Sequence, residues 1–215
     1  MKVPKDSRYY ISNTAAHAFL IANNIHSLPL NPIELAKKNN WEPVTVGHCA
    51  KELVWDRGSV TKSNDGYTMR CFNEYRIIYN EEITTPSRIS WTIMHEIGHI
   101  VLGHLIDFEQ TSLCRADPSK TFGLTEEEYD ILESEADAFA AEVLAPLPLL
   151  VILKIQTVDD IMSYFNLSKK AATYRFENLC AHRRAGVDPS IYAFFKHQFR
   201  SFISDFYEAK GQGSI

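Results

Sequence analysis

The sequence lacks three features that define large classes of protein. No stretch approaches about 18 uninterrupted apolar residues, so we expect no helix that spans a membrane. The N-terminus leads into no apolar segment of the secretory type, which favours a cytoplasmic location. The cysteines form no C-x-x-C pair, so neither a zinc ribbon nor a thioredoxin motif is indicated, and we expect reduced thiols. They are Cys49, Cys71, Cys114 and Cys180.

The chain also lacks an excess of basic residues. Its 215 residues include 22 Lys and Arg against 27 Asp and Glu, a formal net charge of −5, so no overall positive field is available to hold nucleic acid. The acidic excess is local: residues 107–142 hold 11 acids and 2 bases, whereas residues 157–215 hold 8 bases and 6 acids. With 45% hydrophobic and 12% aromatic residues, the composition is that of a folded chain rather than a disordered one.

Hydrophobic periodicity predicts a protein of both helices and strands. Residues 44–46, 67–72 and 76–79 have strand character, and we expect them to form a small antiparallel sheet. Helical spacing predicts helices over residues 9–24, 32–39, 87–106, 125–144, 157–165, 168–183 and 188–207. Asn31 before Pro32 and Thr125 before Glu128 are signals for helix starts. Residues 107–123 show no period and are expected to form a loop. The predicted fold class is α+β.

The strongest motif is H-E-I-G-H at residues 95–99, inside the helix predicted over residues 87–106. Histidines at i and i+4 lie on one helix face, within reach of a single ion. Glu96 follows the first histidine, so its carboxylate can take a proton from a metal-bound water. The surrounding helix is apolar nearly all round and should be buried, and a metal explains the polar residues within it. We therefore expect His95 and His99 to bind zinc and Glu96 to act as the catalytic base.

A catalytic zinc needs a third protein ligand, and two glutamates of the next predicted helix compete for that role. Glu135 lies seven residues from both Glu128 and Glu142, and such an acidic stripe is typical of a solvated face. Glu133 instead shares its face with small residues, which let this helix approach the histidine helix closely. Asp137, four residues after Glu133, can orient a ligand histidine. We expect Glu133 to be the third ligand, with Asp137 behind a histidine and Glu135 as the alternative ligand.

These motifs resemble the ImmA/IrrE family of metallopeptidases, which is found in bacteria, their phages and mobile elements. The resemblance is carried by H-E-I-G-H-I-V-L-G-H at residues 95–104 and by E-x-E-A-D-x-F-A-A-E-x-L-x-P at residues 133–146, and it extends over residues 30–180. Two departures are mild: Asp137 stands where the family often has Asn, and Ala145 where it often has Met. The resemblance implies a cytoplasmic zinc endopeptidase with a zincin-like core of the gluzincin type. Its partner would be a protein substrate, a helix-turn-helix repressor of a phage, mobile element or stress operon.

The implied reaction is hydrolysis of a peptide bond by water, with Zn²⁺ as the one expected cofactor. An oxyanion donor besides the metal is needed, and Tyr129, His104 and Tyr174 are all open candidates. His104 lies five residues beyond His99, about 140° round the same predicted helix, which is poor geometry for the same ion. We therefore expect His104 to interact with the C-terminal end of that helix rather than with the metal.

The C-terminal part of the sequence differs in character from the rest. We expect residues 1–156 to form a zincin-like metallopeptidase domain, and residues 157–215 to form a helical subdomain packed on it. The helices over residues 157–183 resemble a helix-turn-helix in which Lys169, Lys170 and Arg175 would contact DNA. The small basic excess argues against such binding, and we expect no nucleic-acid partner. The last helix has an apolar stripe that favours either core packing or a homodimer surface. The stripe consists of Phe195, Phe199, Phe202 and Phe206.

A second function stays open at the level of sequence. The chain could be a regulator that binds a repressor protein or DNA through its C-terminal helices without cleaving anything. Its metal site would then be structural or vestigial. Cleavage of the partner protein separates the two functions.

Overall fold

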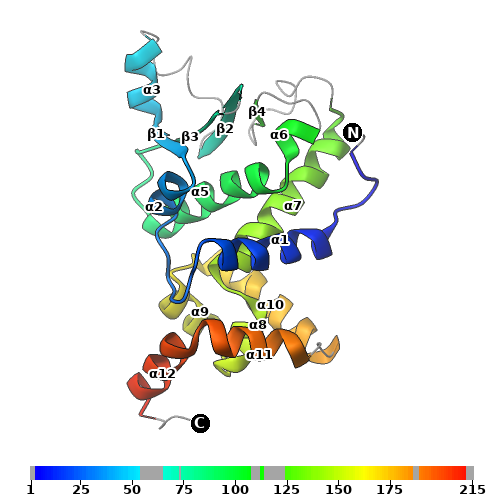
Figure 1. Ribbon diagram of the computed structural model, residues 1–215, viewed down its shortest axis with the longest axis vertical. Coiled ribbons are helices and arrows are strands. Elements are labelled where there is room, and N and C mark those ends of the chain that lie inside the picture. The colour runs from blue at the N-terminus through cyan, green and yellow to red at the C-terminus, as the bar shows by residue number, and fades with distance from the viewer. Residues whose placement is uncertain are drawn as a thin grey trace. The chain divides into compact units, whose positions relative to one another are not determined.

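The structure is a computed structural model that describes residues 3–53, 65–72, 74–107, 112–113, 124–185 and 189–211. These residues form helices and one small sheet, so the predicted α+β class is confirmed (Figure 1). The chain divides into two compact units: unit 1 comprises residues 1–16 and 31–140, and unit 2 comprises residues 17–30 and 141–215. The domain boundary expected after residue 156 stays a prediction. No helix in the described part of the chain is both long and apolar enough to cross a bilayer.

Two helices, α1 (Tyr9–Ala22) and α2 (Pro32–Lys38), precede the sheet where the spacing predicts them. The Asn31 side chain caps α2, because its Oδ1 accepts hydrogen bonds from the backbone N–H groups of Ile33 and Glu34 at 3.1 and 3.4 Å. Pro32 occupies the first helical turn, where an N–H group would have no partner within the helix. The helix start predicted at Asn31 is confirmed.

The sheet has four strands in the order β1-β3-β2-β4. They are β1 (Trp41–Thr45), β2 (Gly66–Cys71), β3 (Glu74–Tyr79) and β4 (Ser112–Leu113). β2 pairs with β3 and with β4 in antiparallel fashion, but β1 is parallel to β3. The sheet is therefore mixed, and the expectation of a purely antiparallel sheet was wrong. Between β1 and β3 the chain passes through α3 (Val46–Leu53) and β2, and this crossover lets the two strands run in the same direction.

The short strand β4 lies inside the segment that the sequence predicts as a loop. Its backbone pairs with β2, where Leu113 lies opposite Thr68. Pairing with a distant strand stabilises β4, so no local period in the sequence signals it. Residues 108–111 and 114–123 of that predicted loop lie outside the described residues.

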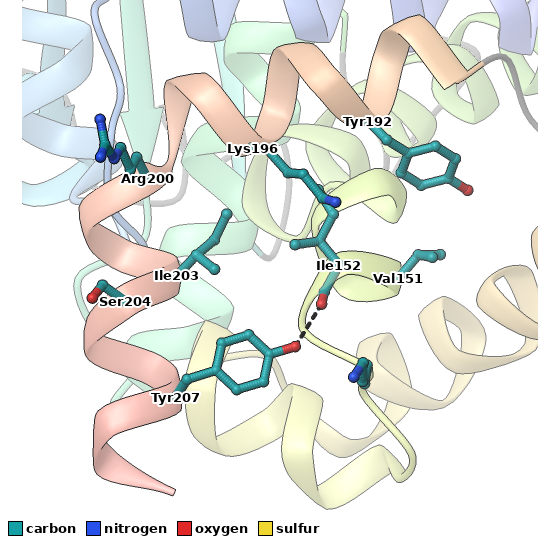
Figure 2. Close-up of a pocket in the computed structure, with 9 residues that line it drawn as sticks. Val151, Ile152, Tyr192, Lys196, Arg200, Ile203, Ser204 and Tyr207 are labelled. Carbon is teal, nitrogen blue, oxygen red and sulfur yellow. Dashed lines mark hydrogen bonds between the residues drawn. The ribbon is translucent and has the colours of Figure 1, made fainter. Parts of the chain in front are cut away.

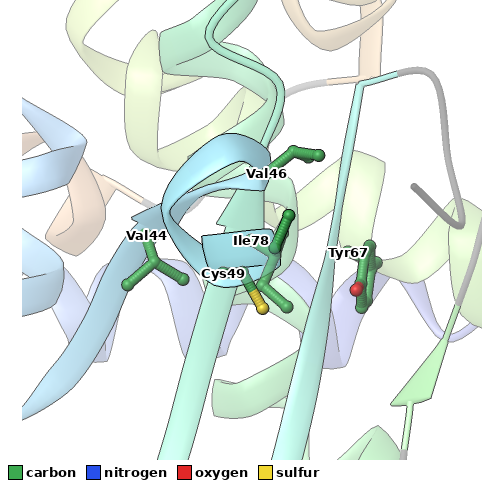
Figure 3. Packing of buried hydrophobic residues seen from close by; sticks show 6 residues of the cluster. Val44, Val46, Cys49, Tyr67 and Ile78 are labelled. Atoms are coloured by element: carbon green, nitrogen blue, oxygen red, sulfur yellow. The ribbon is translucent and has the colours of Figure 1, made fainter. Parts of the chain in front are cut away.

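The two faces of the sheet have different partners, because successive side chains of a strand point to opposite faces. One face packs on α3 in a buried apolar cluster (Figure 3). The cluster consists of Val44, Val46, Cys49, Ala50, Tyr67 and Ile78. Thr68 and Ile77 lie opposite each other one step along β2 and β3, and both are fully buried. Thr68 faces α5 (Pro86–Val101), the helix with the two histidines, which packs against β2 and β3.

The helix α5 is shorter than the sequence predicts. All its residues from Thr92 to Ile100 are buried, as the apolar pattern requires. The prediction continued this helix to Ile106, which was wrong, because α5 ends at Val101. Gly103 has a φ of +74°, which glycine adopts without a Cβ clash, and the chain then enters the short helix α6 (His104–Asp107). His104 therefore does not continue the helical positions of α5.

The helix α7 (Glu126–Leu144) begins and ends as predicted. Thr125 and Glu128 form a reciprocal capping box: the Thr125 hydroxyl accepts from the Glu128 N–H at 3.2 Å, and the Glu128 carboxylate accepts from the Thr125 N–H at 3.0 Å. The helix ends before Pro146, which is the N-cap residue of the next helix, α8 (Leu147–Ile152). Its boundaries are thus determined by local signals.

Unit 2 is helical in its described residues. Its helices include α8 (Leu147–Ile152), α9 (Val158–Phe165), α10 (Lys169–Ala185), α11 (Pro189–Gln198) and α12 (Arg200–Ala209). The sequence did not predict α8, and it predicted one helix over residues 188–207 where the structure has two. The chain leaves helical geometry at Phe199, with φ −105° and ψ 25°, so α11 and α12 are separate. Residue 188 lies outside the described residues.

Two predictions about unit 2 are decided by burial. Phe195 and Phe199 are fully buried, with stacked rings 5.7 Å apart between centroids, so these two residues pack inside the chain. A homodimer stays a prediction. The disfavoured helix-turn-helix interpretation would have Arg175 contact DNA, but Arg175 is buried, forms an ion pair with Glu142 and donates from Nε to the Ala145 carbonyl at 2.7 Å. A buried and paired guanidinium is not available to a phosphate.

Unit 2 also contains a cavity of about 900 Å³ between α8, α11 and α12 (Figure 2). Its lining combines apolar side chains such as Ile152 and Ile203 with the cationic residues Lys154, Lys196 and Arg200. Tyr207 donates its hydroxyl to the Ile152 carbonyl at 2.8 Å, which ties α12 to α8. No residue of the predicted metal site lines this cavity.

Candidate metal centre

Three predicted ligands meet in unit 1. His95 and His99 lie one turn apart on α5, and Glu133 lies on α7. The Nε2 atoms of the two histidines are 3.0 Å apart. The Glu133 carboxylate places Oε2 at 3.3 Å from His95 Nε2 and Oε1 at 3.1 Å from His99 Nε2. All three residues are buried, and one ligand atom from each lies within 4.8 Å of the others.

The two helices approach closely because the residues between them are small. Gly98 lies between the two histidines, and a Cβ atom built on it would be 3.2 Å from the Cα of Ala136 on α7. Ala136 is fully buried and lies one turn from Glu133. The close approach predicted from the small residues beside Glu133 is therefore observed, and it lets a short glutamate side chain reach both imidazoles.

A carboxylate fixes the orientation of His95. Its Nδ1 atom lies 2.8 Å from Oδ1 of Asp137, one turn after Glu133 on α7. A carboxylate only accepts hydrogen bonds, so the hydrogen-bond network assigns the imidazole proton to Nδ1. The Nε2 atom then faces Glu133 and His99. This is the contact that the sequence predicts for Asp137, and it is typical of a residue behind a metal ligand.

The charges of the site favour a cation. Burial opposes a charged His95, but the Glu133 and Asp137 carboxylates outweigh it and raise the pKa of this imidazole to about 10. Burial also opposes a charged Glu133, yet His95 and His99 bring the pKa of its carboxyl well below the ordinary value. Positive charge between the imidazoles and the carboxylates is therefore favourable. Protons can supply it, and so can a divalent metal ion. Two imidazole nitrogens and one carboxylate are a donor set that suits zinc.

Glu96 adjoins this cluster and has a partner that the sequence did not indicate. The Thr68 hydroxyl, on β2, donates to Oε2 of Glu96 at 2.8 Å. Burial raises the pKa of the Glu96 carboxyl. Thr68 is 28 residues away, and only its strand register against Ile77 turns it toward α5. No motif around Thr68 signals this contact.

The acidic stripe predicted on α7 is not solvated. Glu135 and Glu142 are both 1% exposed, so the prediction of an exposed face was wrong at these positions. Each is buried because it has a basic partner: Arg8 for Glu135 and Arg175 for Glu142. Glu135 does not belong to the group of ligand atoms that converges with His95 and His99.

His104 is the residue near the site whose position the sequence predicted least well. It is fully buried, and its Nδ1 lies 2.9 Å from Nδ1 of His99, on the side of that ring away from Glu133. Its Nε2 lies 3.2 Å from Oε2 of Glu135. Both ring nitrogens are thus engaged within the protein, so His104 has no free group for an oxyanion. The signal that could have found it is Gly103, which follows the end of α5 and has a positive φ.

The other two oxyanion candidates are placed differently. Tyr129 is buried in an apolar cluster with Leu105 and Leu132. Tyr174 belongs to unit 2 and is exposed. Neither placement identifies the donor.

A buried pair of histidines and a glutamate on two helices, beside a further glutamate, is the arrangement of a metallopeptidase site in an α+β protein. Residues 57–177 match the Peptidase_M78 family, described as the IrrE N-terminal-like domain. The match covers more than half of the chain, and the chain belongs to this family. The family predicted from the two motifs is thus confirmed. No match was found among curated proteins.

Proposed function

We propose that the chain is a zinc-dependent endopeptidase of the gluzincin type, with a zincin-like core, that cleaves a protein substrate in the cytoplasm. The observation that carries the proposal is the convergence of His95, His99 and Glu133, with Glu96 beside them. When bound there, zinc would polarise both the scissile carbonyl and the attacking water. The three ligands would hold the zinc ion, and the carboxylates of Glu96 and Asp137 beside them offset its positive charge.

Glu96 is the proposed general base. Its Oε2 accepts from Thr68, and among the described residues no hydrogen bond to Oε1 is present, so one oxygen is held while the other can receive a proton. The carboxylate takes a proton from the attacking water and returns it to the leaving amine, which balances the hydrolysis. Thr68 limits the rotation of the carboxylate and so keeps Oε1 directed to the reacting groups.

The proposed substrate is a helix-turn-helix repressor of a phage, mobile element or stress operon. Support comes from the resemblance of the two motifs to the ImmA/IrrE family, to which the chain belongs. The burial of Arg175 disfavours the alternative that the C-terminal helices grip DNA directly. A repressor gene adjacent to this chain's own gene would supply the substrate to test first.

The test combines zinc content with cleavage. We expect about one zinc per chain in the purified wild type, and a loss of zinc in His99→Ala and Glu133→Ala. Glu127→Ala, an exposed glutamate of the same helix, serves as the matched control and should keep the metal. Glu96→Gln should keep the metal and lose cleavage of the repressor. Zinc well below one per chain in the wild type would refute the metal site. A stable complex without a cleaved product would instead favour a non-proteolytic regulator.

A further inference from the structure

Behind His99, on the side away from Glu133, lies a row of hydrogen-bonded polar side chains that no motif predicts. Its members are His104, Glu135 and Arg8, which we call the relay, and all of them lie in unit 1. His95 is oriented by one carboxylate, whereas His99 is connected through an imidazole and a carboxylate to a guanidinium. The two ligand histidines of the site are therefore supported in different ways.

The outer end of the relay is a strongly held carboxylate. Oε1 of Glu135 accepts from the backbone N–H of Arg8 at 2.7 Å and from Arg8 Nε at 2.8 Å. Oε2 accepts from Arg8 Nη2 at 2.8 Å. This two-point pairing balances the charge of a glutamate that is 1% exposed. Arg8 is 127 residues away in sequence and directly precedes α1, so the start of that helix is joined to the metal centre.

The positions of the protons follow from the donors and acceptors. Glu135 can only accept, so the contact of 3.2 Å between its Oε2 and His104 requires a proton on Nε2 of His104. Because Arg8 already balances the charge of Glu135, His104 need not carry a charge, and its Nδ1 is then an acceptor. The contact of 2.9 Å between the two Nδ1 atoms requires the proton of His99 on Nδ1. The Nε2 of His99 then faces Glu133 and Nε2 of His95, where a bound cation can take the place of a proton.

We infer that Arg8, Glu135 and His104 are positioning residues that hold His99 in the tautomer and orientation a metal ligand requires. The inference rests on the proposed metal site and adds residues that act on it without touching the ion. A ring held through its Nδ1–H group presents Nε2 to the other two ligands, so the arrangement selects the ring orientation in which His99 can bind a metal. Loss of such an outer partner lowers metal affinity by about 10–100-fold.

Two variants of His104 separate this role from simple packing. Asparagine can present a carbonyl oxygen to the His99 Nδ1–H group, whereas leucine cannot. We expect His104→Leu to bind zinc about 10–100-fold more weakly than the wild type and His104→Asn to recover most of the affinity. The measurement is competition for zinc against a chromophoric chelator, with the fold checked by circular dichroism. Equal affinities for His104→Leu and the wild type would overturn the inference, and so would equally weak binding by His104→Leu and His104→Asn.

The distant end of the relay gives an independent test. Arg8→Ala should weaken zinc binding although Arg8 is not one of the three ligands, and Arg88→Ala is the matched control. Arg88 also pairs with a carboxylate of unit 1, Asp65, but the two side chains of that pair are 55% and 29% exposed. If Arg8→Ala and Arg88→Ala bind zinc as the wild type does, Arg8 has no such role and the relay fails.

The tautomer can also be observed directly in the metal-free wild type by long-range ¹H–¹⁵N correlation of the His99 ring. We expect a protonated Nδ1 of His99, and an unprotonated Nδ1 would contradict the relay. This measurement decides the matter even if a His104 variant fails to fold. A wild type that binds no zinc would refute the proposed function. A wild type that binds zinc as tightly as Arg8→Ala and His104→Leu would refute only the relay.

Discussion

Replacing Gly98 by alanine tests how tightly the two helices of the site are packed. Gly98 lies on α5 between His95 and His99, and a Cβ atom there would be 3.1 Å from Cδ1 of Phe139 and 3.2 Å from both the Cα and the carbonyl oxygen of Ala136. Two of these three contacts are to the backbone of α7, which cannot rotate away as a side chain can. The substitution should therefore move α7 relative to α5 by a few tenths of an ångström.

Two opposing contributions determine the change in stability. Alanine in a helix interior is favoured over glycine by about 1 kcal/mol. Overpacking a tight contact costs about 1–3 kcal/mol. The balance predicts that Gly98→Ala lowers the free energy of unfolding by about 0–2 kcal/mol rather than raising it. The displacement of α7 also moves Glu133 away from the histidines, so the loss of zinc affinity should exceed the loss of stability.

The assay is urea unfolding of the wild type and Gly98→Ala in the metal-free state, followed by competition for zinc. Ala136→Gly provides an internal check: the close contacts are to Cα and O of Ala136, so removing its Cβ should not rescue Gly98→Ala. If Gly98→Ala is about 1 kcal/mol more stable than the wild type and binds zinc equally well, then the helices are not in tight contact and the reasoning fails.

Three further predictions follow from the described contacts. Thr68→Val should keep the metal but lower kcat about tenfold, because the hydroxyl that holds Glu96 is lost, and Thr68→Ser should restore it; unchanged kcat would exclude Thr68. Burial opposes the charge of Glu142, but Arg175 and His17 lower the pKa of its carboxyl. A lowered pKa adds stability that is present above about pH 4.3 and lost as the pH falls through the folded-state value. Glu142→Gln should therefore be less stable than the wild type at neutral pH, with the difference shrinking in acid unfolding curves below about pH 4.3; a constant difference would contradict this. Chelation should lower the free energy of unfolding, by about 4 kcal/mol if free zinc was about 1,000 times its Kd, and calorimetry showing no change would contradict binding to the native state.

Local signals in the sequence were reliable wherever near neighbours determine the structure. The starts of α2 and α7 follow from Asn31 and Thr125, whose side chains cap residues two or three positions on. The pairing of His95 with His99 follows from helical spacing alone. These features depend on hydrogen bonds and periodicity within a few residues, so one stretch of sequence contains all the information.

Two of the errors occur where a single residue interrupts a regular pattern. Gly103 and Phe199 each stand in an apolar stretch that reads as one continuous helix, and at each the structure has two helices. At Gly103 the consequence was large, since a continuous helix would place His104 about 140° from His99. The turn instead brings the two rings to a contact of 2.9 Å.

The sequence by itself determined the family, the α+β class and the two-histidine face of α5. Only the tertiary structure decided which glutamate of α7 converges with that face. Glu133 and Glu135 are two residues apart on one helix and both are buried, but only Glu133 lies with the two histidines. The tertiary structure alone brought Thr68 to Glu96 and Arg8 to Glu135. Such contacts join residues 28 and 127 positions apart, and they depend on strand register and on how closely two helices pack. Neither quantity is encoded in any local stretch of the chain, because both result from the packing of side chains contributed by distant segments.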